Sequence, residues 1–477
     1  MPDLLAARSQ MAMSLAFHII FAVVGIGMPA LMVVAEYRWL KTRDPVYLDL
    51  AKRWAKGTAI LFAVGAVSGT VLSFELGLLW PRFMQMAGPI IGMPFALEGF
   101  AFFTEAIFLG IYLYGWDRIA PRAHLAAGTL VAVSGALSGV FVVIANAWMN
   151  APTGFDIGPD GTPVHVSPLR AMANPAAFSE TLHMVLAAYA ATGLVVAGIH
   201  AFMLLRLRRG AGAASSASTA ASRVSASVPL VPDALAFHRR ALAVALLVGA
   251  PAAIVQPLSG DVSARFVAHW QPTKLAALEG QFRTERGAPL RIGGWPDEAA
   301  RETPFALEIP YALSLLAFHD PHAVVRGLDD FPRGDWPPVR VVHVAFQAMV
   351  ALGTTMALVS LWAAAVWWRG GRRRARRDAD ARSVDSPTPW EAWPWLLRAL
   401  VVVAPMGFLA IEAGWTVTEV GRQPWVVFGV VRTSDAVTPV PGLIVPFVTF
   451  TLLYCGLGVI VVWLLYRQIV KTTGPRP

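Results

Sequence analysis

Residues 414–425 combine side chains that could perform chemistry. Glu419 and Arg422 lie three residues apart, and Trp415 and Trp425 flank them. In a helix this spacing puts the carboxylate and the guanidinium one turn apart on the same face. The surrounding chain is very apolar, and ionisable groups near a membrane are usually kept for function. We therefore expect Glu419 and Arg422 to be functional, and the question is what they hold.

Three other apolar stretches contain possible metal ligands, namely His18, His183 and Met349. Taken singly, a histidine or methionine in an apolar helix is more often a structural or packing residue. Together they suggest haem. An imidazole and a thioether make a six-coordinate site suited to electron transfer, whereas a single histidine or carboxylate leaves one axial position open for oxygen.

Two carboxylates, Glu98 and Glu105, are seven residues apart in another apolar stretch. Seven residues are close to two helical turns, so both side chains face the same way. In the next stretch Ser138 and Asn146, eight residues apart, share roughly one face. Paired glutamates inside a membrane favour a role in handling protons or ions.

Composition identifies the class of protein. The 477 residues are 56% hydrophobic and only 14% charged, which excludes disorder and argues against a soluble enzyme. The single cysteine, Cys455, excludes a disulfide within the chain and a cysteine-based metal site. The net charge of +9 collects in short segments between apolar runs, which indicates membrane topology and not nucleic-acid binding.

The apolar runs predict an all-α polytopic membrane protein with nine transmembrane helices. Basic segments follow the odd-numbered spans, which places the N-terminus outside and the C-terminus in the cytoplasm. We divide the chain into helices one to six (1–256), a long external loop (257–339) and helices seven to nine (340–477). The predicted spans are 14–35, 57–79, 94–115, 124–148, 179–205, 237–256, 340–367, 394–413 and 443–466.

Several short motifs, in order from about Arg8 to Arg467, resemble subunit I of the cytochrome bd family of quinol oxidases. The sequence of residues 94–105 is most similar to that of the cyanide-insensitive branch of the family. The motifs are Arg8-x-Gln10 ahead of His18, Leu97-Glu98-Gly99, Phe102-Phe103-Thr104-Glu105, Gly115-Trp116-Asp117-Arg118, the run 145–150, the run 271–279 and Gly421-Arg422-Gln423-Pro424-Trp425.

The resemblance implies three haems. His183 and Met349 would be the axial pair of a low-spin haem b (b558-like). His18 and Glu419 would be axial ligands of two high-spin haems, one a haem b (b595-like) and the other haem d or a third haem b, and the sequence does not decide which ligand holds which. Further cofactor-binding residues would be Trp415, Arg422 and Arg8, with the arginines suited to haem propionates.

The resemblance also makes residues 257–339 a quinol-binding loop. Lys274 and Glu279 would act on ubiquinol, where a carboxylate base is useful because quinol loses protons with its electrons. Their five-residue spacing does not stack them on one helical face, so a partly helical loop is expected. Glu98, Glu105 and Ser138 would form a proton path. Gln347 stands where many family members have arginine, which leaves the low-spin haem with one fewer nearby cation.

The activity implied is that of a quinol:oxygen oxidoreductase in the bacterial plasma (inner) membrane, N-terminus periplasmic, which reduces oxygen to water and generates a proton gradient without pumping. Its partners would be a second membrane subunit (subunit II), a small single-helix subunit and membrane lipids. Two alternatives are a membrane b-type electron-transfer cytochrome and a proton-coupled transporter. A transporter predicts inverted repeats and broken helices, which the sequence does not reveal.

Overall fold

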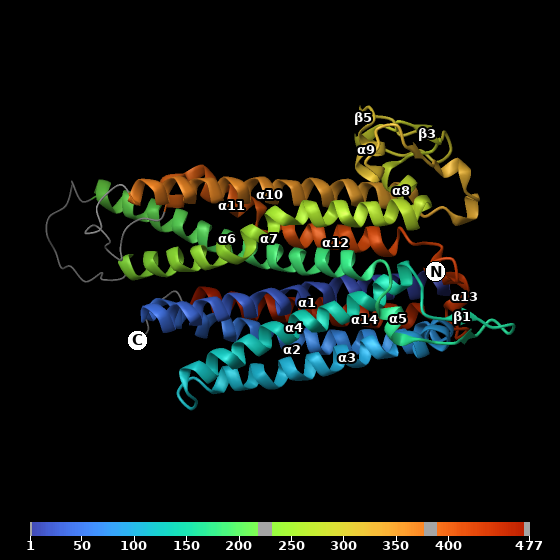
Figure 1. Ribbon diagram of the computed structural model, residues 1–477. Helices are drawn as coiled ribbons and strands as arrows, with labels where there is room; N and C mark the ends of the chain where they lie inside the picture. Colours follow the sequence, from blue (N-terminus) through green and yellow to red (C-terminus); the bar gives the residue numbers. More distant parts are fainter. Residues whose placement is uncertain (1, 218–230, 376–388, 472–477) are drawn as a thin grey trace.

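The computed structural model of the chain describes residues 2–217, 231–375 and 389–471. Within these ranges nine spans are long and apolar enough to cross a membrane, which confirms the predicted fold class. They run side by side in one elongated bundle (Figure 1). The spans are α1 (Asp3–Thr42), α2 (Pro45–Leu79), α3 (Pro81–Tyr114), α4 (Pro121–Asn150), α6 (Ala177–Ala217), α7 (Val231–Trp270), α10 (Val339–Ala375), the pair α11 (Pro394–Val403) and α12 (Met406–Glu419), and α14 (Ile444–Lys471).

Proline defines where many of these helices begin. It lies in the first turn of α2, α3, α4 and α11, where its missing N–H costs no hydrogen bond and its fixed φ already suits a helix. Asp44 adds a cap to α2, because its carboxylate accepts from the backbone N–H of Val46 at 3.0 Å. The same carboxylate pairs with Arg240 of α7 at 3.1 Å, so this cap also ties two helices together.

The helices form two groups. In Figure 1, α6, α7, α10, α11 and α12 lie together, and α1, α2, α3, α4 and α14 lie beside them. Helix α6 joins the groups, because it packs against α1 and α4 as well as α7, α11 and α12. A site built from α1, α4, α6 and α12 therefore lies at the boundary between the groups.

The eighth span is interrupted. Helix α11 ends at Val403, and α12 begins at Met406 after Pro405. A proline cannot supply the hydrogen bond that a continuous helix needs at this point. The break lets α12 take its own direction, and it extends to Glu419, beyond the predicted end at residue 413.

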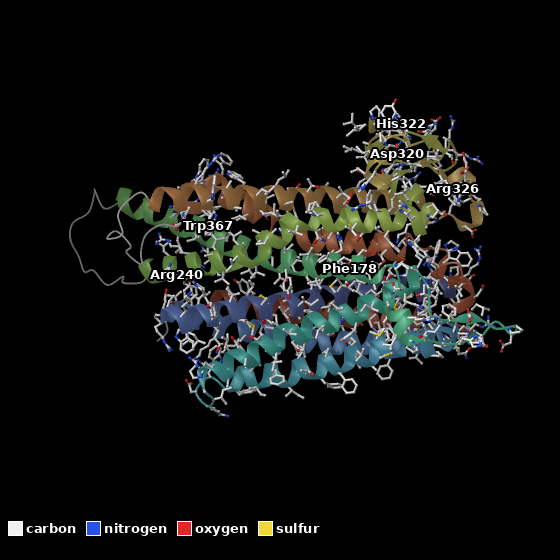
Figure 2. The ribbon with its side chains drawn as sticks, in the orientation of Figure 1. Phe178, Arg240, Asp320, His322, Arg326 and Trp367 are labelled. Atoms are coloured by element: carbon white, nitrogen blue, oxygen red, sulfur yellow. The ribbon has the colours of Figure 1, made fainter. Side chains whose placement is uncertain are left out.

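Within the predicted loop 257–339, the residues that follow α7 fold into a small unit, here called the 257–339 unit, at the end of the bundle where α1 begins (Figure 1). Helix α7 continues to Trp270, past the predicted boundary at residue 256. Asp320, His322 and Arg326 project from the unit, whereas Trp367 projects from the side of α10 (Figure 2). The elements of the unit are α8 (Pro272–Glu279), β3 (Glu285–Arg286), β4 (Leu290–Gly293), β5 (Ala306–Ile309), α9 (Ala312–Phe318), β6 (Val324–Val325), η1 (Leu328–Asp330) and η2 (Arg333–Asp335).

Four antiparallel pairs of short strands supplement the helices, and the sequence analysis did not predict them. Strand β3 pairs with β6, and β4 pairs with β5 in the register Leu290 to Ile309. The other pairs close connections between spans. The elements of these connections are β1 (Asp156–Ile157) with β2 (Pro163–Val164), β7 (Trp425–Val427) with β8 (Val431–Arg432), α5 (Pro168–Met172), α13 (Thr433–Ala436) and η4 (Pro389–Ala392).

Helices α6 and α7 approach each other closely at Gly193 and Gly249. A Cβ atom on Gly193 would lie 2.4 Å from the Cα of Gly249, nearer than any real contact. Small residues at a helix crossing allow the backbone-to-backbone packing that associates membrane helices. This crossing fixes α6, which carries His183, against α7.

We predict that Gly193→Ala destabilises the protein by about 1–3 kcal/mol, because the new methyl group meets a backbone that cannot move aside. The measurement is the thermal unfolding midpoint of the detergent-solubilised protein. Gly353→Ala in α10 is the matched control, since a Cβ there would meet nothing within 4 Å. An unchanged midpoint for Gly193→Ala would contradict the packing described.

Candidate functional site

Glu419 is the last residue of α12 and receives two strong hydrogen bonds. Its Oε2 accepts from Arg422 Nη2 at 2.6 Å, and its Oε1 accepts from Asn146 Nδ2 of α4 at 2.5 Å. The one-turn spacing predicted for Glu419 and Arg422 therefore brings the two side chains together. The contact with Asn146 fixes the carboxylate between the two helix groups.

Arg422 has hydrogen-bond donors that the described residues do not satisfy. The residue is 2% exposed, and its Nε and Nη1 atoms have no hydrogen-bond partner within the described residues. A buried donor without a partner is costly, and a guanidinium is shaped to bind a second carboxylate with two parallel hydrogen bonds. A haem propionate would satisfy these donors, so the residue fits the predicted group.

His18 lies on α1, and a serine of α2 holds its ring. Its Nδ1 is 2.9 Å from the hydroxyl of Ser68 on α2, and that hydroxyl donates its own hydrogen to the carbonyl of Val64 at 2.9 Å. With the hydroxyl donating to this carbonyl, its oxygen accepts from Nδ1, and Nε2 then keeps a free lone pair. An orienting hydrogen bond on the other ring nitrogen is typical of a metal-ligating histidine. Beside the ring is Gly69, where a Cβ atom would lie 2.9 Å from Cε1.

His183 on α6 repeats this arrangement. Its Nδ1 is 2.9 Å from the hydroxyl of Ser259 on α7, and Ser259 donates to the carbonyl of Gln256 at 2.8 Å. Nε2 is again the acceptor, and in this structure the Gln256 side-chain amide lies 3.1 Å from it. A lone pair that can accept from an amide can also bind iron, so His183 fits the predicted role.

Met349 and Trp415 complete the group. A Cβ atom on Gly414 of α12 would lie 3.1 Å from the Met349 sulfur on α10, so the glycine leaves room beside the thioether. The next residue, Trp415, packs in one hydrophobic cluster with Ile19 and Met184, the sequence neighbours of His18 and His183. The tryptophan therefore lies where α1, α6 and α12 pack together, and these helices carry three of the four predicted haem ligands.

Arg8 is not part of this group. It lies on α1 ten residues before His18, or about 15 Å along the helix axis. It forms no ion pair with any residue that the structure describes. Its predicted pairing with a haem propionate stays a prediction.

Glu98 and Glu105 line one face of α3, as predicted. Glu98 Oε1 accepts from the Ser138 hydroxyl of α4 at 3.2 Å. Glu105 is buried, and Cβ atoms on Gly135 of α4 and Gly25 of α1 would lie 3.1 Å and 3.9 Å from its carboxyl group. The glycines make room for a carboxyl group inside the bundle.

The same face of α3 continues to a group that the sequence analysis missed. Tyr112 follows Glu105 by seven residues, and its ring is 4.4 Å from the ring of His124. The Nε2 of His124 donates to the Tyr112 carbonyl at 2.9 Å, and its Nδ1 is 2.8 Å from Glu36 Oε1. All three residues are buried. Extending the seven-residue spacing of the glutamates by one step would have found Tyr112.

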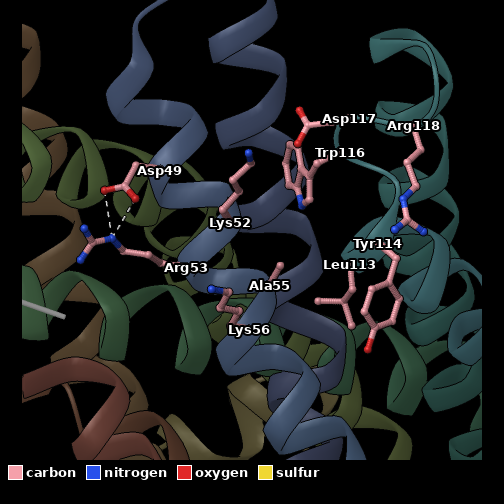
Figure 3. A pocket seen from close by; sticks show the side chains of 10 residues that line it. All are labelled: Asp49, Lys52, Arg53, Ala55, Lys56, Leu113, Tyr114, Trp116, Asp117 and Arg118. Atoms are coloured by element: carbon pink, nitrogen blue, oxygen red, sulfur yellow. Dashed lines mark hydrogen bonds and ion pairs between the residues drawn. The ribbon is translucent and has the colours of Figure 1, made fainter. Parts of the chain in front are cut away.

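A cavity of about 390 Å³ opens beside this group (Figure 3). It lies between the start of α2 and the end of α3, at the end of the bundle away from α8 (Figure 1). Its wall includes Trp116, whose ring is 3.9 Å from that of His124. Lys52 lies over the Trp116 ring at 5.3 Å, and Arg53 pairs with Asp49 at 2.9 Å. The cavity is lined by Asp49, Lys52, Arg53, Ala55, Lys56, Leu113, Tyr114, Trp116, Asp117 and Arg118.

Lys274 and Glu279 lie on α8 and face different surroundings. Lys274 Nζ is 3.4 Å from the Thr418 carbonyl, and a Cβ atom on Gly421 would lie 3.1 Å from its Cε, so the lysine reaches toward Glu419. Burial lowers the pKa of Lys274 to about 8, against the attraction of Glu180. Burial also raises the pKa of Glu279 to about 8, with Arg291 opposing. The helix confirms the expectation of a partly helical loop.

Glu180 is the second group that the sequence analysis missed. It lies on α6 one turn before His183, and its Oε1 accepts from Asn150 Nδ2 at 3.0 Å. The same amide nitrogen lies 3.3 Å from Asn146 Oδ1. The three-residue spacing between Glu180 and His183 is the same signal that singled out Glu419 and Arg422.

Gln347 and His343 attach the 257–339 unit to α10. Gln347 Nε2 donates to the Arg291 carbonyl at 2.9 Å, and the Gly293 N–H donates to Gln347 Oε1 at 3.1 Å. His343 is buried and bonds the carbonyls of Leu278 and Gly293 at 2.7 and 3.0 Å. Both residues therefore hold α8 and β4 in place.

The helices and side chains define a multi-pass membrane protein whose interior offers imidazole, thioether and carboxylate ligands. Residues 6–473 match the profile of a family described as "Cytochrome bd terminal oxidase subunit I". The chain belongs to this family and is subunit I of a cytochrome bd-type terminal quinol oxidase. The predicted family is therefore confirmed, over both alternatives that the sequence left open.

Individual relatives support the assignment over the whole length. A Bacillus subtilis (strain 168) protein, named provisionally as a cytochrome bd menaquinol oxidase subunit I, is 37% identical over 98% of this chain and 96% of its own. The cytochrome bd ubiquinol oxidase subunit 1 of the same strain is 30% identical over 99% and 94%. The solved bd oxidase structure from Geobacillus thermodenitrificans is 36% identical, covers 98% of both chains and superposes with a TM-score of 0.83.

We predict that Gln347→Ala loosens β4, because the strand loses two hydrogen bonds to α10. Amide hydrogen exchange of residues 290–293 should accelerate by about 30-fold, as expected when two hydrogen bonds worth roughly 1 kcal/mol each are lost. Thr355→Ala is the control, since that hydroxyl bonds only the Ala351 carbonyl of its own helix. Equal exchange in both variants would contradict the attachment described.

Proposed function

We propose that this subunit binds three haems and uses them to oxidise quinol and reduce oxygen to water. When bound, the haems would take electrons from quinol and deliver them to oxygen. The observation that carries the proposal is the convergence of His18, His183, Met349 and Glu419 on the helices around Trp415. Family membership implies haem, and these side chains are the ligands that the interior offers.

Each ligand has a distinct role in the proposal. His183 and Met349 would hold the low-spin haem b (b558-like), since the helices that carry the imidazole and the thioether, α6 and α10, both pack against α7 and α12. His18 and Glu419 would hold the two high-spin haems, one a haem b (b595-like) and the other haem d or a third haem b. Arg422 would bind a propionate through its two free donors while its third nitrogen orients Glu419.

Quinol oxidation is assigned to the 257–339 unit, with Glu279 as the base. A buried carboxyl with a pKa of about 8 accepts a proton well near neutral pH, and Glu279 Oε2 has no hydrogen-bond partner within the described residues. Lys274 reaches the Glu419 segment and would connect the quinol unit to the high-spin haem. Ubiquinol is the substrate that the sequence resemblance implied. The names of the two Bacillus relatives differ on this point, so both quinols belong in the assay.

Protons for water would come from the opposite end of the bundle. Tyr112, Glu105 and Glu98 step along one face of α3 at intervals of about 10 Å, which bridging water can span. His124 and Glu36 would pass protons from the cavity in Figure 3 to this line. Ser138 would position the last carboxyl group. Uptake and release on opposite sides would build a proton gradient without pumping.

The basic residues around that cavity support the orientation. Lys52, Lys56 and Arg118 lie at the end away from α8, where the positive-inside rule places the cytoplasm. The quinol unit and the N-terminus would then face the periplasm of a bacterial plasma (inner) membrane. Family membership implies other subunits, and we propose subunit II and a small single-helix subunit as the partners, with membrane lipids around them.

We predict that a reduced-minus-oxidised optical spectrum of the purified complex shows one low-spin and two high-spin haems. His183→Ala should remove the low-spin signal and leave the high-spin signals, because only that haem loses its imidazole. A band in the red would identify haem d, and high-spin b signals alone would identify a third haem b. Survival of the low-spin signal in His183→Ala would refute the ligand assignment.

We predict that quinol oxidation accelerates as the pH rises toward 8. The pKa of Glu279 is raised to about 8, so the carboxyl group is mostly protonated at pH 7 and the base form grows about tenfold per pH unit below 8. Stopped-flow reduction of the low-spin haem by ubiquinol and by menaquinol measures the rate. Glu279→Gln should slow it by about 10²-fold and abolish the pH dependence.

The control for this experiment is Glu308→Gln. Glu308 is exposed and pairs with the same Arg291 at 2.9 Å, so it changes the charge near Arg291 without touching the buried carboxyl group. It should keep the wild-type pH dependence. A flat pH profile in the unaltered protein would contradict the role of Glu279.

A further inference from the structure

Four charged side chains form one group where α6, α8 and α12 meet beside α4, and of these Lys274 and Arg422 are buried. Glu180 and Glu419 are the carboxylates, and Lys274 and Arg422 are the cations that act on both of them. Two negative and two positive charges balance within the group. Burying a charge is costly unless it is paired and hydrogen-bonded, so removing one member leaves the others uncompensated.

Hydrogen bonds connect the two carboxylates through two asparagines of α4. Glu419 accepts from Asn146 Nδ2 at 2.5 Å, so the Oδ1 of Asn146 points the other way, toward Asn150. Asn150 Nδ2 lies 3.3 Å from that oxygen and 3.0 Å from Glu180 Oε1. An ionised carboxylate only accepts hydrogen bonds, so the two glutamates at the ends dictate the orientation of both amides between them.

The backbone further restricts this chain of hydrogen bonds. Asn150 is 1% exposed, and its carbonyl accepts from the side chain of Gln271 at 2.8 Å, directly before α8. Asn146 and Asn150 are four residues apart and therefore lie on one face of α4. Within this chain of hydrogen bonds, as the described residues form it, Glu180 is the member that α6 contributes. It lies one turn from His183.

We propose that Glu180 is a positioning residue for Glu419: it orients the amides of Asn150 and Asn146 so that Asn146 donates to Glu419, and its charge balances Lys274. The inference rests on the proposed role of Glu419 as a haem ligand. Glu180 would thereby set both the geometry and the reduction potential of the high-spin haem at Glu419. Its position on α6 also places it one turn from His183, the proposed ligand of the low-spin haem.

Three variants separate the two effects. Glu180→Gln keeps an acceptor for Asn150 and removes the charge. Asn150→Ala keeps the charge of Glu180 and breaks the chain of hydrogen bonds to Glu419. Glu180→Ala removes both. Each is purified as the complete oxidase, and the readouts are the optical and electron paramagnetic resonance spectra of the high-spin haems and their midpoint potentials by redox titration.

Loss of a negative charge favours the reduced haem. In Glu180→Gln we expect an unchanged high-spin spectrum. The equilibrium should shift about tenfold toward the reduced haem, which raises the midpoint potential by about 59 mV for one electron. In Asn150→Ala we expect an altered high-spin spectrum with a smaller shift in potential. Glu180→Ala should show both changes. The low-spin signal should persist in all three and reports that the protein is folded.

Glu391→Gln is the matched control. Glu391 is 1% exposed, so it is buried more deeply than Glu180, and it pairs with Arg239 at 2.7 Å and Arg208 at 3.6 Å. Arg208 lies 28 residues beyond Glu180 on α6, which places this carboxylate about 40 Å away. The high-spin spectrum and potential should not change in this variant.

Glu419→Ala separates this inference from the proposed function. Loss of one high-spin signal in that variant, with unaltered spectra and potentials in Glu180→Ala and Asn150→Ala, would overturn the role of Glu180 alone. Survival of every haem signal in Glu419→Ala would refute the ligand assignment itself. Should Glu180→Ala not assemble, Glu180→Gln and Asn150→Ala still decide the question, since each tests one of the two effects.

Discussion

Charged and polar groups inside an apolar bundle need partners from other helices, and this requirement organises the structure. Glu419 is held by Arg422 on its own segment and by Asn146 of α4. His18 and His183 are each held through Nδ1 by a serine of the neighbouring helix. Since the contacts with Asn146 and with the two serines each join two helices, the site and the packing of the bundle stabilise each other. The glycines beside Glu105 and Met349 serve the same purpose by making room for these groups.

Much of the fold could be predicted from the sequence, because long apolar runs with basic flanks are typical of membrane-spanning helices. The nine spans, the partly helical loop and the pairing of Glu419 with Arg422 all follow from periodicity and spacing. Helix ends were harder to predict. Helix α7 continues past the hydrocarbon thickness to Trp270, and Pro405 divides the eighth span into two helices. Hydropathy reports where a chain is apolar and does not report where a helix stops.

The sequence could not show which polar groups meet across helices. Glu180, His124 and Glu36 resemble many other polar residues of the sequence, and only the packing of α1, α4 and α6 brings them against their partners. Lys274 is a related case. The resemblance assigned it to quinol together with Glu279, but the structure directs its side chain toward Thr418 and Gly421. Gln347 also gains a role that its position alone did not suggest, since it binds the backbone of β4.

Helix α8 has only two turns, yet its opposite sides contact different regions of the protein. Lys274 projects toward the segment that carries Glu419, and Glu279 projects toward Arg291. Hydrogen bonds from His343 and Gln271 hold the two ends of this short helix. A molecule that displaced α8 on the side of Glu279 would also displace the side of Lys274, because both belong to one short helix. An inhibitor that binds beside Glu279 would therefore also change the position of Lys274 relative to Glu419, which the inhibitor does not touch. Resistance could then arise from substitutions at residues that no inhibitor contacts.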